Sequence, residues 1–294
     1  MRKFIKFVAA ALALAAFPAL AQAAVPDPVL KAALVKSLDA VLPVWGAEVL
    51  RAPNGVDWTL NLNVAGVARS FGPAQLGDLA AKAPAGTEGV KGPAGLVRVD
   101  KARGYVRLVN NLLVPQIGTT PIQFPTDLQT REMGLKILGQ LGIPAAEIGA
   151  LDVATQMAAD GSVRSVRPDR VRAILKLFSA NRKVNNLSVF GSKAIIAITG
   201  PGQVQRLKTQ WPVFRLDARD ALLLRADVLS RAGDALVDQN LPATSVLKAQ
   251  IGYAPADDTV GSAYIPVALI SAVDLSTPVL ISVPLVKPSV IDDR

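Results

Sequence analysis

The chain has 294 residues, of which 51% are hydrophobic and 19% charged, so it holds enough apolar material for a packed core and is not intrinsically disordered. It contains no histidine and no cysteine. Their absence excludes Ser-His-Asp and Cys-His catalysis, the usual zinc sites, thiol redox chemistry and disulfides. We therefore expect a protein that is not an enzyme and that has no metal or cofactor site.

The first 23 residues have the three parts of a secretory signal. Arg2, Lys3 and Lys6 form a basic start, residues 7–20 are apolar, and Ala21-Gln22-Ala23 supplies small residues for cleavage. The apolar run of about 14 residues is shorter than the roughly 20 that span a bilayer. The sequence predicts cleavage after Ala23 and a periplasmic or secreted protein without a transmembrane span.

The charge balance is basic, with 32 Lys and Arg against 23 Asp and Glu. Cleavage of the signal removes three basic residues and no acidic ones, which leaves a net charge of +6. A positive balance favours anionic partners such as cell-wall polymers or lipid head groups. Nucleic acid is not an expected partner, because the basic residues are spread along the chain and no recognition module accompanies them.

The first half predicts an α+β unit over residues 24–115. A helix is expected over 28–42 with Asp27 as its N-cap. Alternating apolar residues predict a hairpin of strands at 45–51 and 56–64 around a Pro53-Asn54-Gly55 turn. A helix at 73–83, a glycine-rich loop at 83–95 and strands at 96–99 and 105–109 follow. The proline-containing segment 114–125 is the predicted boundary.

The second unit, residues 126–294, opens with a strong helix pattern over 126–142 that Thr126 or Asp127 can cap. A strand at 153–157, an Asp160-Gly161 turn and an arginine-rich stretch at 163–177, either strand or helix, come next. Strands are then expected at 184–190, 194–199 and 204–214, a helix over 217–238, and strands at 246–253, 264–272 and 279–286. Without a regular βαβ repeat, this order predicts an α+β fold of two antiparallel sheets, each covered by helices.

Two kinds of residue cluster leave a hydrolase open as an alternative. Ser245 and Lys248 have the S-x-x-K spacing of serine enzymes with a lysine base, but the other elements of those enzymes do not follow. Carboxylates are paired at Asp257-Asp258, at Asp217 with Asp220, and at Asp292-Asp293. Their positions at a loop tip, a helix start and the chain end are typical of solvated or capping residues.

Large aromatic residues are the candidate contacts for a partner. Rings can stack on sugars and peptides, and they can equally fill a core. Trp45, Trp58, Trp211, Tyr253 and Tyr264 could line a binding groove, although core packing is the favoured interpretation for the three tryptophans. Trp211, Tyr253 and Tyr264, together with Arg182, are the candidate binding residues.

Residues 178–214 resemble the PepSY-like and fungalysin/thermolysin-propeptide-like modules of exported bacterial proteins. The likeness rests on a basic residue, a short hairpin, an alternating strand, a glycine turn and a returning strand, carried here by Arg182, Asn185-Asn186, Val189, Gly191, residues 194–198, Gly202, Val204 and Trp211-Pro212. Asn186 stands where a glycine is usual, and it is compatible with a left-handed turn residue. The resemblance extends over about 126–272. It implies a helix laid on a curled antiparallel sheet that binds or restrains peptidases, and it names no catalytic residues.

These observations favour a non-catalytic exported protein that binds another exported protein through a sheet edge or a sheet face. The resemblance implies the role of a peptidase inhibitor or propeptide-like module. The alternative is a structural protein associated with an anionic envelope polymer or surface.

Overall fold

The computed structural model describes residues 27–52, 54–72, 74–82, 89–113, 122–160, 170–217, 221–257, 259, 261–272 and 279–287. The predicted signal peptide and most of the predicted boundary segment lie outside these residues. So do Gly161 of the predicted turn and Asp220, Asp258, Asp292 and Asp293.

The strands form one sheet rather than the two predicted. They are β1 (Val90–Gly92), β2 (Gly95–Asp100), β3 (Tyr105–Asn110), β4 (Ile148–Asp160), β5 (Arg170–Val184), β6 (Leu187–Ile198), β7 (Val204–Gln210), β8 (Leu247–Pro255), β9 (Tyr264–Ala272) and β10 (Val279–Pro284). Their order is β1-β2-β3-β7-β6-β8-β9-β10, with β5 also on β6 and β4 on β5. The α+β class is confirmed. The division into two sheets is wrong, because β3 from the first half pairs along its length with β7 from the second.

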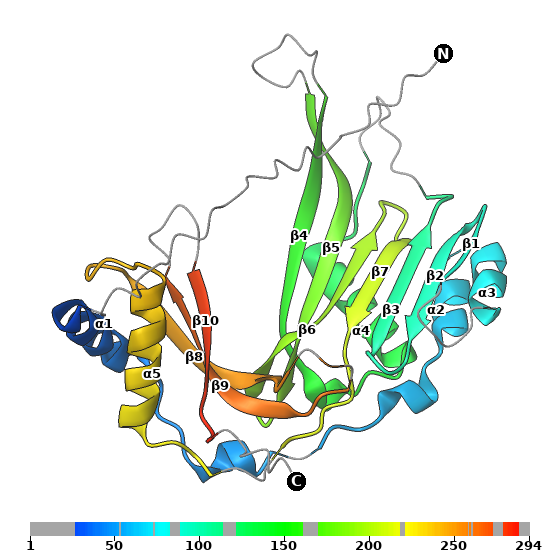
Figure 1. The fold of residues 1–294 in the computed structure, drawn as a ribbon. Helices are drawn as coiled ribbons and strands as arrows, with labels where there is room; N and C mark the ends of the chain where they lie inside the picture. Colours follow the sequence, from blue (N-terminus) through cyan, green and yellow to red (C-terminus); the bar gives the residue numbers. More distant parts are fainter. Residues whose placement is uncertain are drawn as a thin grey trace, which may run out of the picture.

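The sheet changes direction at β6. Residues 193–198 of this strand pair with β7, whereas Ser188 and Val189 pair with β8 in a short parallel contact. β7 and β8 therefore lie one after the other along the same edge of β6. The result is a U (Figure 1), with β1–β7 in the first lobe and β8–β10 in the second.

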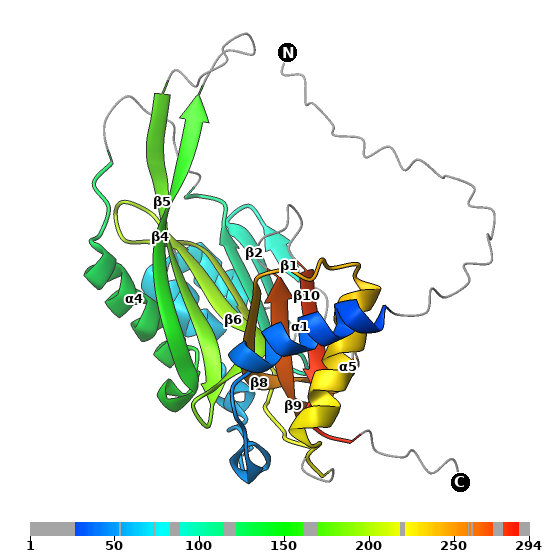
Figure 2. The same ribbon diagram turned by 90° about the vertical axis from the view of Figure 1, so that its left-hand side faces the viewer.

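Helices cover the outer side of each lobe (Figures 1 and 2). They are α1 (Pro28–Val41), α2 (Val64–Phe71), α3 (Ala74–Ala81), α4 (Asp127–Gln140) and α5 (Arg225–Asp238), with 3₁₀ turns η1 (Ala47–Leu50), η2 (Trp58–Asn61) and η3 (Ala145–Glu147). α2, α3 and α4 bury one apolar core against the first lobe. α1 and α5 bury a second core against β8–β10. The inner face of the sheet carries no described helix.

Local signals account for the helices that the sequence predicts. The Asp27 side chain accepts hydrogen bonds from the amides of Val29 and Leu30 at the start of α1. Thr126 and Gln129 form a reciprocal capping box at the start of α4. α3 also lies within its predicted range, whereas α5 begins at Arg225 rather than at residue 217.

The predicted hairpin over 45–64 is wrong. The region forms η1, η2 and the start of α2. The Asp57 side chain accepts from the amide of Thr59, and that of Asn63 accepts from the amide of Gly66. Such local side-chain bonds compete with a strand, so the apolar alternation there does not mark a sheet face.

The predicted strands of the second half differ mainly in their limits. The arginine-rich stretch contributes to strand β5, and the strands expected at 184–190 and 194–199 are the single strand β6. Asn185 and Asn186 form the turn before β6, both with positive φ. Beyond Lys176 toward its tip, β5 pairs with β4 alone, so the two strands project from the sheet as an arm (Figure 2). No described helix is long and apolar enough to cross a membrane.

Candidate functional site

The four predicted binding residues meet at the bend between the lobes. Arg182 lies near the end of β5, Trp211 directly follows β7, Tyr253 lies in β8, and Tyr264 begins β9. Each side chain is almost fully buried. They therefore surround a common point, which we call the junction, but they offer almost no surface to a partner.

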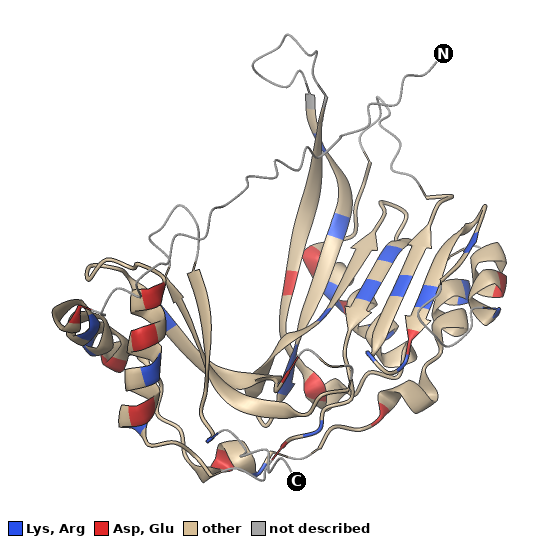
Figure 3. Ribbon diagram, viewed as in Figure 1, with Lys and Arg blue, Asp and Glu red and all other residues tan. Residues whose placement is uncertain are grey.

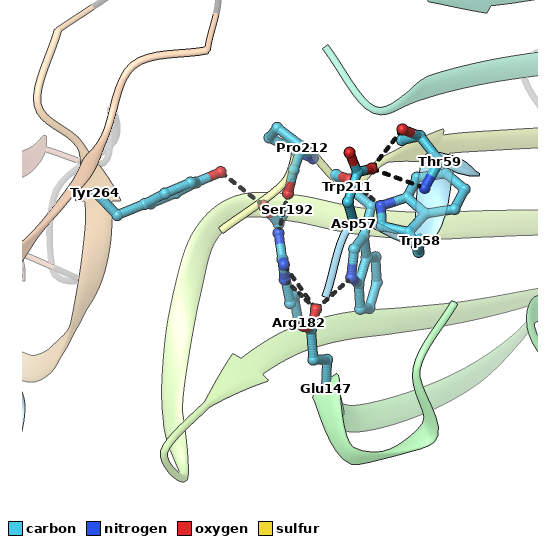
Figure 4. A network of polar contacts seen from close by, with 9 residues as sticks. All are labelled: Asp57, Trp58, Thr59, Glu147, Arg182, Ser192, Trp211, Pro212 and Tyr264. Atoms are coloured by element: carbon cyan, nitrogen blue, oxygen red, sulfur yellow. Dashed lines mark hydrogen bonds and ion pairs between the residues drawn. The ribbon is translucent and has the colours of Figure 1, made fainter. Parts of the chain in front are cut away.

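Glu147 of η3 is the acceptor at the centre of the junction (Figure 4). Its Oε2 lies 2.8 Å from Nε and 2.6 Å from Nη2 of Arg182. It also accepts a hydrogen bond of 3.1 Å from the indole Nε1 of Trp211. Nη1 of Arg182 donates to the carbonyl of Pro212. The buried charge pair thus joins the two ends of the β4–β5 hairpin to the segment that leaves β7.

Aromatic rings extend the junction into the second lobe. Phe214 stacks on Tyr264 with ring centroids 5.0 Å apart and meets Tyr253 edge-on at 5.1 Å. The Arg182 guanidinium lies 5.7 Å from the Phe214 ring. The Tyr253 hydroxyl donates to the carbonyl of Val49 over 3.1 Å. These contacts hold β8 and β9 against the end of the first lobe.

The N-terminal segment closes the junction from the other side. Trp58 Nε1 donates to the carbonyl of Trp211 over 2.6 Å, and the amide of Gly55 donates to the carbonyl of Phe214 over 2.8 Å. A Cβ on Gly55 would lie 2.8 Å from Oε1 of Glu147, so this backbone approaches as closely as only glycine permits.

Burial shifts the pKa values of ionisable groups in the junction. Desolvation lowers the pKa of Arg182, and the nearby Glu147 opposes that shift. Burial raises the pKa of Tyr253 and of Tyr264. Tyrosine is uncharged at physiological pH even without this shift, so both phenols connect the lobes as neutral groups.

A hollow of about 610 Å³ opens on the inner side of the sheet next to the junction. It is lined by Gly149, Ala150, Asn181, Arg182, Lys183, Asn186, Ser188, Val189, Phe190, Gly191, Ser192, Lys193 and Gln250. The lining comes from β4, β5, β6 and β8, and so from both lobes. Among the described residues that line it, none is acidic. The volume lies within the range typical of ligand sites.

A row of basic residues crosses the inner face of the first lobe (Figure 3). Arg98 on β2 lies directly opposite Arg107 on β3, and Arg107 lies directly opposite Lys208 on β7. The residues on either side of each one point into the helix-covered core or are buried, so the three side chains lie on the helix-free face. We call Arg98, Arg107 and Lys208 the basic row.

The row and the hollow are neighbours on one face. Lys193, which lines the hollow, lies opposite Gln210 of β7, and Gln210 is two residues from Lys208 on the same side of that strand. Like charges opposite one another destabilise a sheet. Arg98 places its guanidinium 5.5 Å from the ring of Tyr105, yet its Nε is buried without a hydrogen-bond partner among the described residues.

The candidates for hydrolysis lie elsewhere. Ser245 is buried, and its hydroxyl has no described hydrogen-bond partner. Lys248 lies in β8 opposite Ser271. Asp257 accepts hydrogen bonds from the amide and the hydroxyl of Thr259 in an exposed turn, and these bonds lower its pKa. No group of three or more acidic side chains that could hold a metal ion occurs among the described residues.

Comparison with known proteins adds no relative. No family model matches the chain, and no curated protein is significantly similar to it. The resemblance to PepSY-like modules thus stays a prediction, and the candidate site rests on its own geometry.

Proposed function

We propose that this chain is a non-catalytic protein-binding module that receives an anionic partner on the helix-free inner face of its sheet. The observation that carries the proposal is the basic row. Three cations stand side by side on neighbouring strands, with no ion pair from Arg107 or Lys208 to a described acidic residue.

The rest of the fold supports a binding role. Both lobes bury their opposite face under helices, so the inner face is the broad sheet surface left for contact. An antiparallel sheet with one open face presents regularly spaced side chains on a rigid support. An anionic partner would offset the repulsion within the row and gain charge-assisted contacts.

A structural protein bound to an anionic envelope polymer is the second candidate, because the same row would attract a polymer of phosphates or carboxylates. The first proposal includes export of the protein from the cytoplasm and a peptidase as its partner. Both candidates predict binding that weakens as salt rises. They differ in what is bound.

The test compares capture by three forms of the tagged chain, expressed in its own cells and cross-linked mildly. The forms are the unchanged chain, Arg107→Gln with Lys208→Gln, and the charge-matched control Lys36→Gln with Arg131→Gln on the outer helices. We expect one dominant protein that the row variant loses and the control keeps. Capture that survives the row variant would refute the proposal. Capture of envelope polymer without a stoichiometric protein would favour the second candidate.

A further inference from the structure

We infer that the hollow is a carboxylate-binding site and that, with the basic row, it holds an acidic polypeptide segment in extended form. This inference rests on the proposed function and specifies the partner of the same face.

The charge in the hollow is uncompensated. Lys183 and Lys193 line it, and neither makes an ion pair with a described residue. The third cation in the lining, Arg182, has its guanidinium held by Glu147 and by the carbonyl of Pro212. The hollow thus has two free ammonium groups in a concave wall without acidic residues. The protein wall screens charge less than open solvent does, so the two ammonium groups attract an anion strongly.

The neutral lining indicates a peptide rather than a polyphosphate. Asn181, Asn186 and Gln250 contribute side-chain amides, which both donate and accept hydrogen bonds and so match peptide groups. Phe190 adds an apolar wall. The hollow presents no free guanidinium fork, the group best suited to a phosphate. Carboxylates carried on a polypeptide satisfy the lysines and the amides together.

The backbone around the hollow leaves it open. Gly191 has a φ of +78°, and a Cβ at this position would meet nothing within 4 Å. Gln250 belongs to the part of β8 that pairs with β9 but not with β6. One side of the hollow therefore borders residues 247–251 of β8, whose second edge has no described strand partner and where an extended segment can add hydrogen bonds.

The length of the segment follows from strand geometry. The path from Arg98 across β3 and β7 to Ile195 crosses three strand spacings, about 14 Å, and Ser188 lies about 23 Å further along β6. A segment of about eight extended residues, laid diagonally over the strands, spans the roughly 27 Å from Arg98 to Ser188. An acidic stretch of that length can contact the row and reach the hollow at once.

The experiment measures fluorescence anisotropy of a labelled ten-residue peptide of alternating Glu and Ser with the full chain. The expected result is salt-sensitive binding that weakens about tenfold in Lys183→Gln/Lys193→Gln and in Arg107→Gln/Lys208→Gln. Lys36→Gln/Arg131→Gln should bind as the unchanged chain does. Circular dichroism and urea midpoints establish that each variant is folded.

Two further peptides identify the source of the carboxylate. If the Glu peptide still binds with an amidated C-terminus and the matching Gln peptide does not, side-chain carboxylates occupy the hollow. If the Gln peptide with a free C-terminus binds and its amide does not, the chain end occupies it. The first outcome supports the inference, and the second overturns it, because a segment without acidic side chains would then bind through its chain end alone.

Binding unaffected by Lys183→Gln/Lys193→Gln would overturn the inference, as would binding of inorganic polyphosphate with none of the peptides. The proposed function has a separate readout. If cellular capture still depends on Arg107 and Lys208 while no peptide binds, only the acidic-segment inference is lost.

Discussion

Loss of the Glu147 carboxylate should lower the free energy of unfolding far more than loss of a surface carboxylate does. Oε2 accepts hydrogen bonds from Nε of Arg182 at 2.8 Å and from Nε1 of Trp211 at 3.1 Å, and Nη2 of Arg182 lies 2.6 Å from it in the ion pair. The Arg182 side chain is fully buried, and that of Glu147 is 10% exposed. Glu147→Gln leaves the guanidinium buried without a counter-charge, a change that costs about 3–5 kcal/mol. The glutamine oxygen still accepts a hydrogen bond, so we expect the lower end, about 3 kcal/mol.

A double-mutant cycle tests the reason for this cost. Arg182→Met removes the stranded charge, so Glu147→Gln/Arg182→Met should be more stable than the sum of the single changes predicts, with a coupling of at least about 1.5 kcal/mol. Urea unfolding followed by tryptophan fluorescence reports on the site, because Trp58 and Trp211 lie in it. Far-UV circular dichroism on the same samples tests two-state behaviour.

The control is the Lys31–Asp234 pair between α1 and α5, whose atoms are 2.6 Å apart and whose side chains are 28% and 51% exposed. Asp234→Asn should change stability by no more than about 1 kcal/mol. A loss below about 1 kcal/mol for Glu147→Gln, or single changes that add within about 0.5 kcal/mol, would refute the view that the charge pair is coupled and buried.

Three other measurements follow from the same structure. A Cβ on Gly134 of α4 would overlap the ring of Phe178, so Gly134→Ala should lower the free energy of unfolding by about 1–3 kcal/mol, measured in urea. Gly139→Ala, on the open side of the same helix, should raise it by up to about 1 kcal/mol. Equal effects of the two substitutions would contradict the packing of α4 on Phe178. Burial raises the pKa of Tyr264, so the unfolded chain loses this proton first, and stability should fall as the pH rises above the ordinary tyrosine value of about 10. Tyr264→Phe should flatten that fall, and an unchanged slope would contradict it. Amides of residues 155–159 in the arm should exchange hydrogen with solvent faster than amides of the part of β5 that pairs with β6. The reason is that a two-stranded ribbon is only marginally stable. Uniform protection from exchange would contradict the isolation of the arm.

The sequence predicts those elements whose cause is local. Asp27 and Thr126 mark helix starts because their side chains bond the first free amides. Strand β2 is readable because Val97 and Val99 alternate with Arg98. The same alternation misleads at 56–64, where Leu60 is 77% exposed and the caps formed by Asp57 and Asn63 take precedence.

The candidate site is less accessible to sequence reasoning, because it depends on pairing between distant strands. Alternation places Arg107 and Lys208 on the polar face of their own strands, but only the register of β3 with β7 places them opposite one another, about a hundred residues apart in sequence. The candidate residues chosen as large aromatics did come together, in the buried junction. Ring size indicates burial, and the lysines around the hollow have no comparable signal in the sequence.

The position of α1 also determines when the second lobe can fold during synthesis. α1 is the first described element, yet its apolar face packs on α5 and β8 of the second lobe, and α5 starts at Arg225. At 5–20 residues per second, a ribosome needs roughly 10–40 s to reach α5 after it has completed α1. During that interval the first lobe can assemble alone, while Leu34 and Leu38 have no partner. The core of the second lobe is complete only when both α1 and the α5–β10 region are present, so a truncation that removes α1 or β10 removes part of this core.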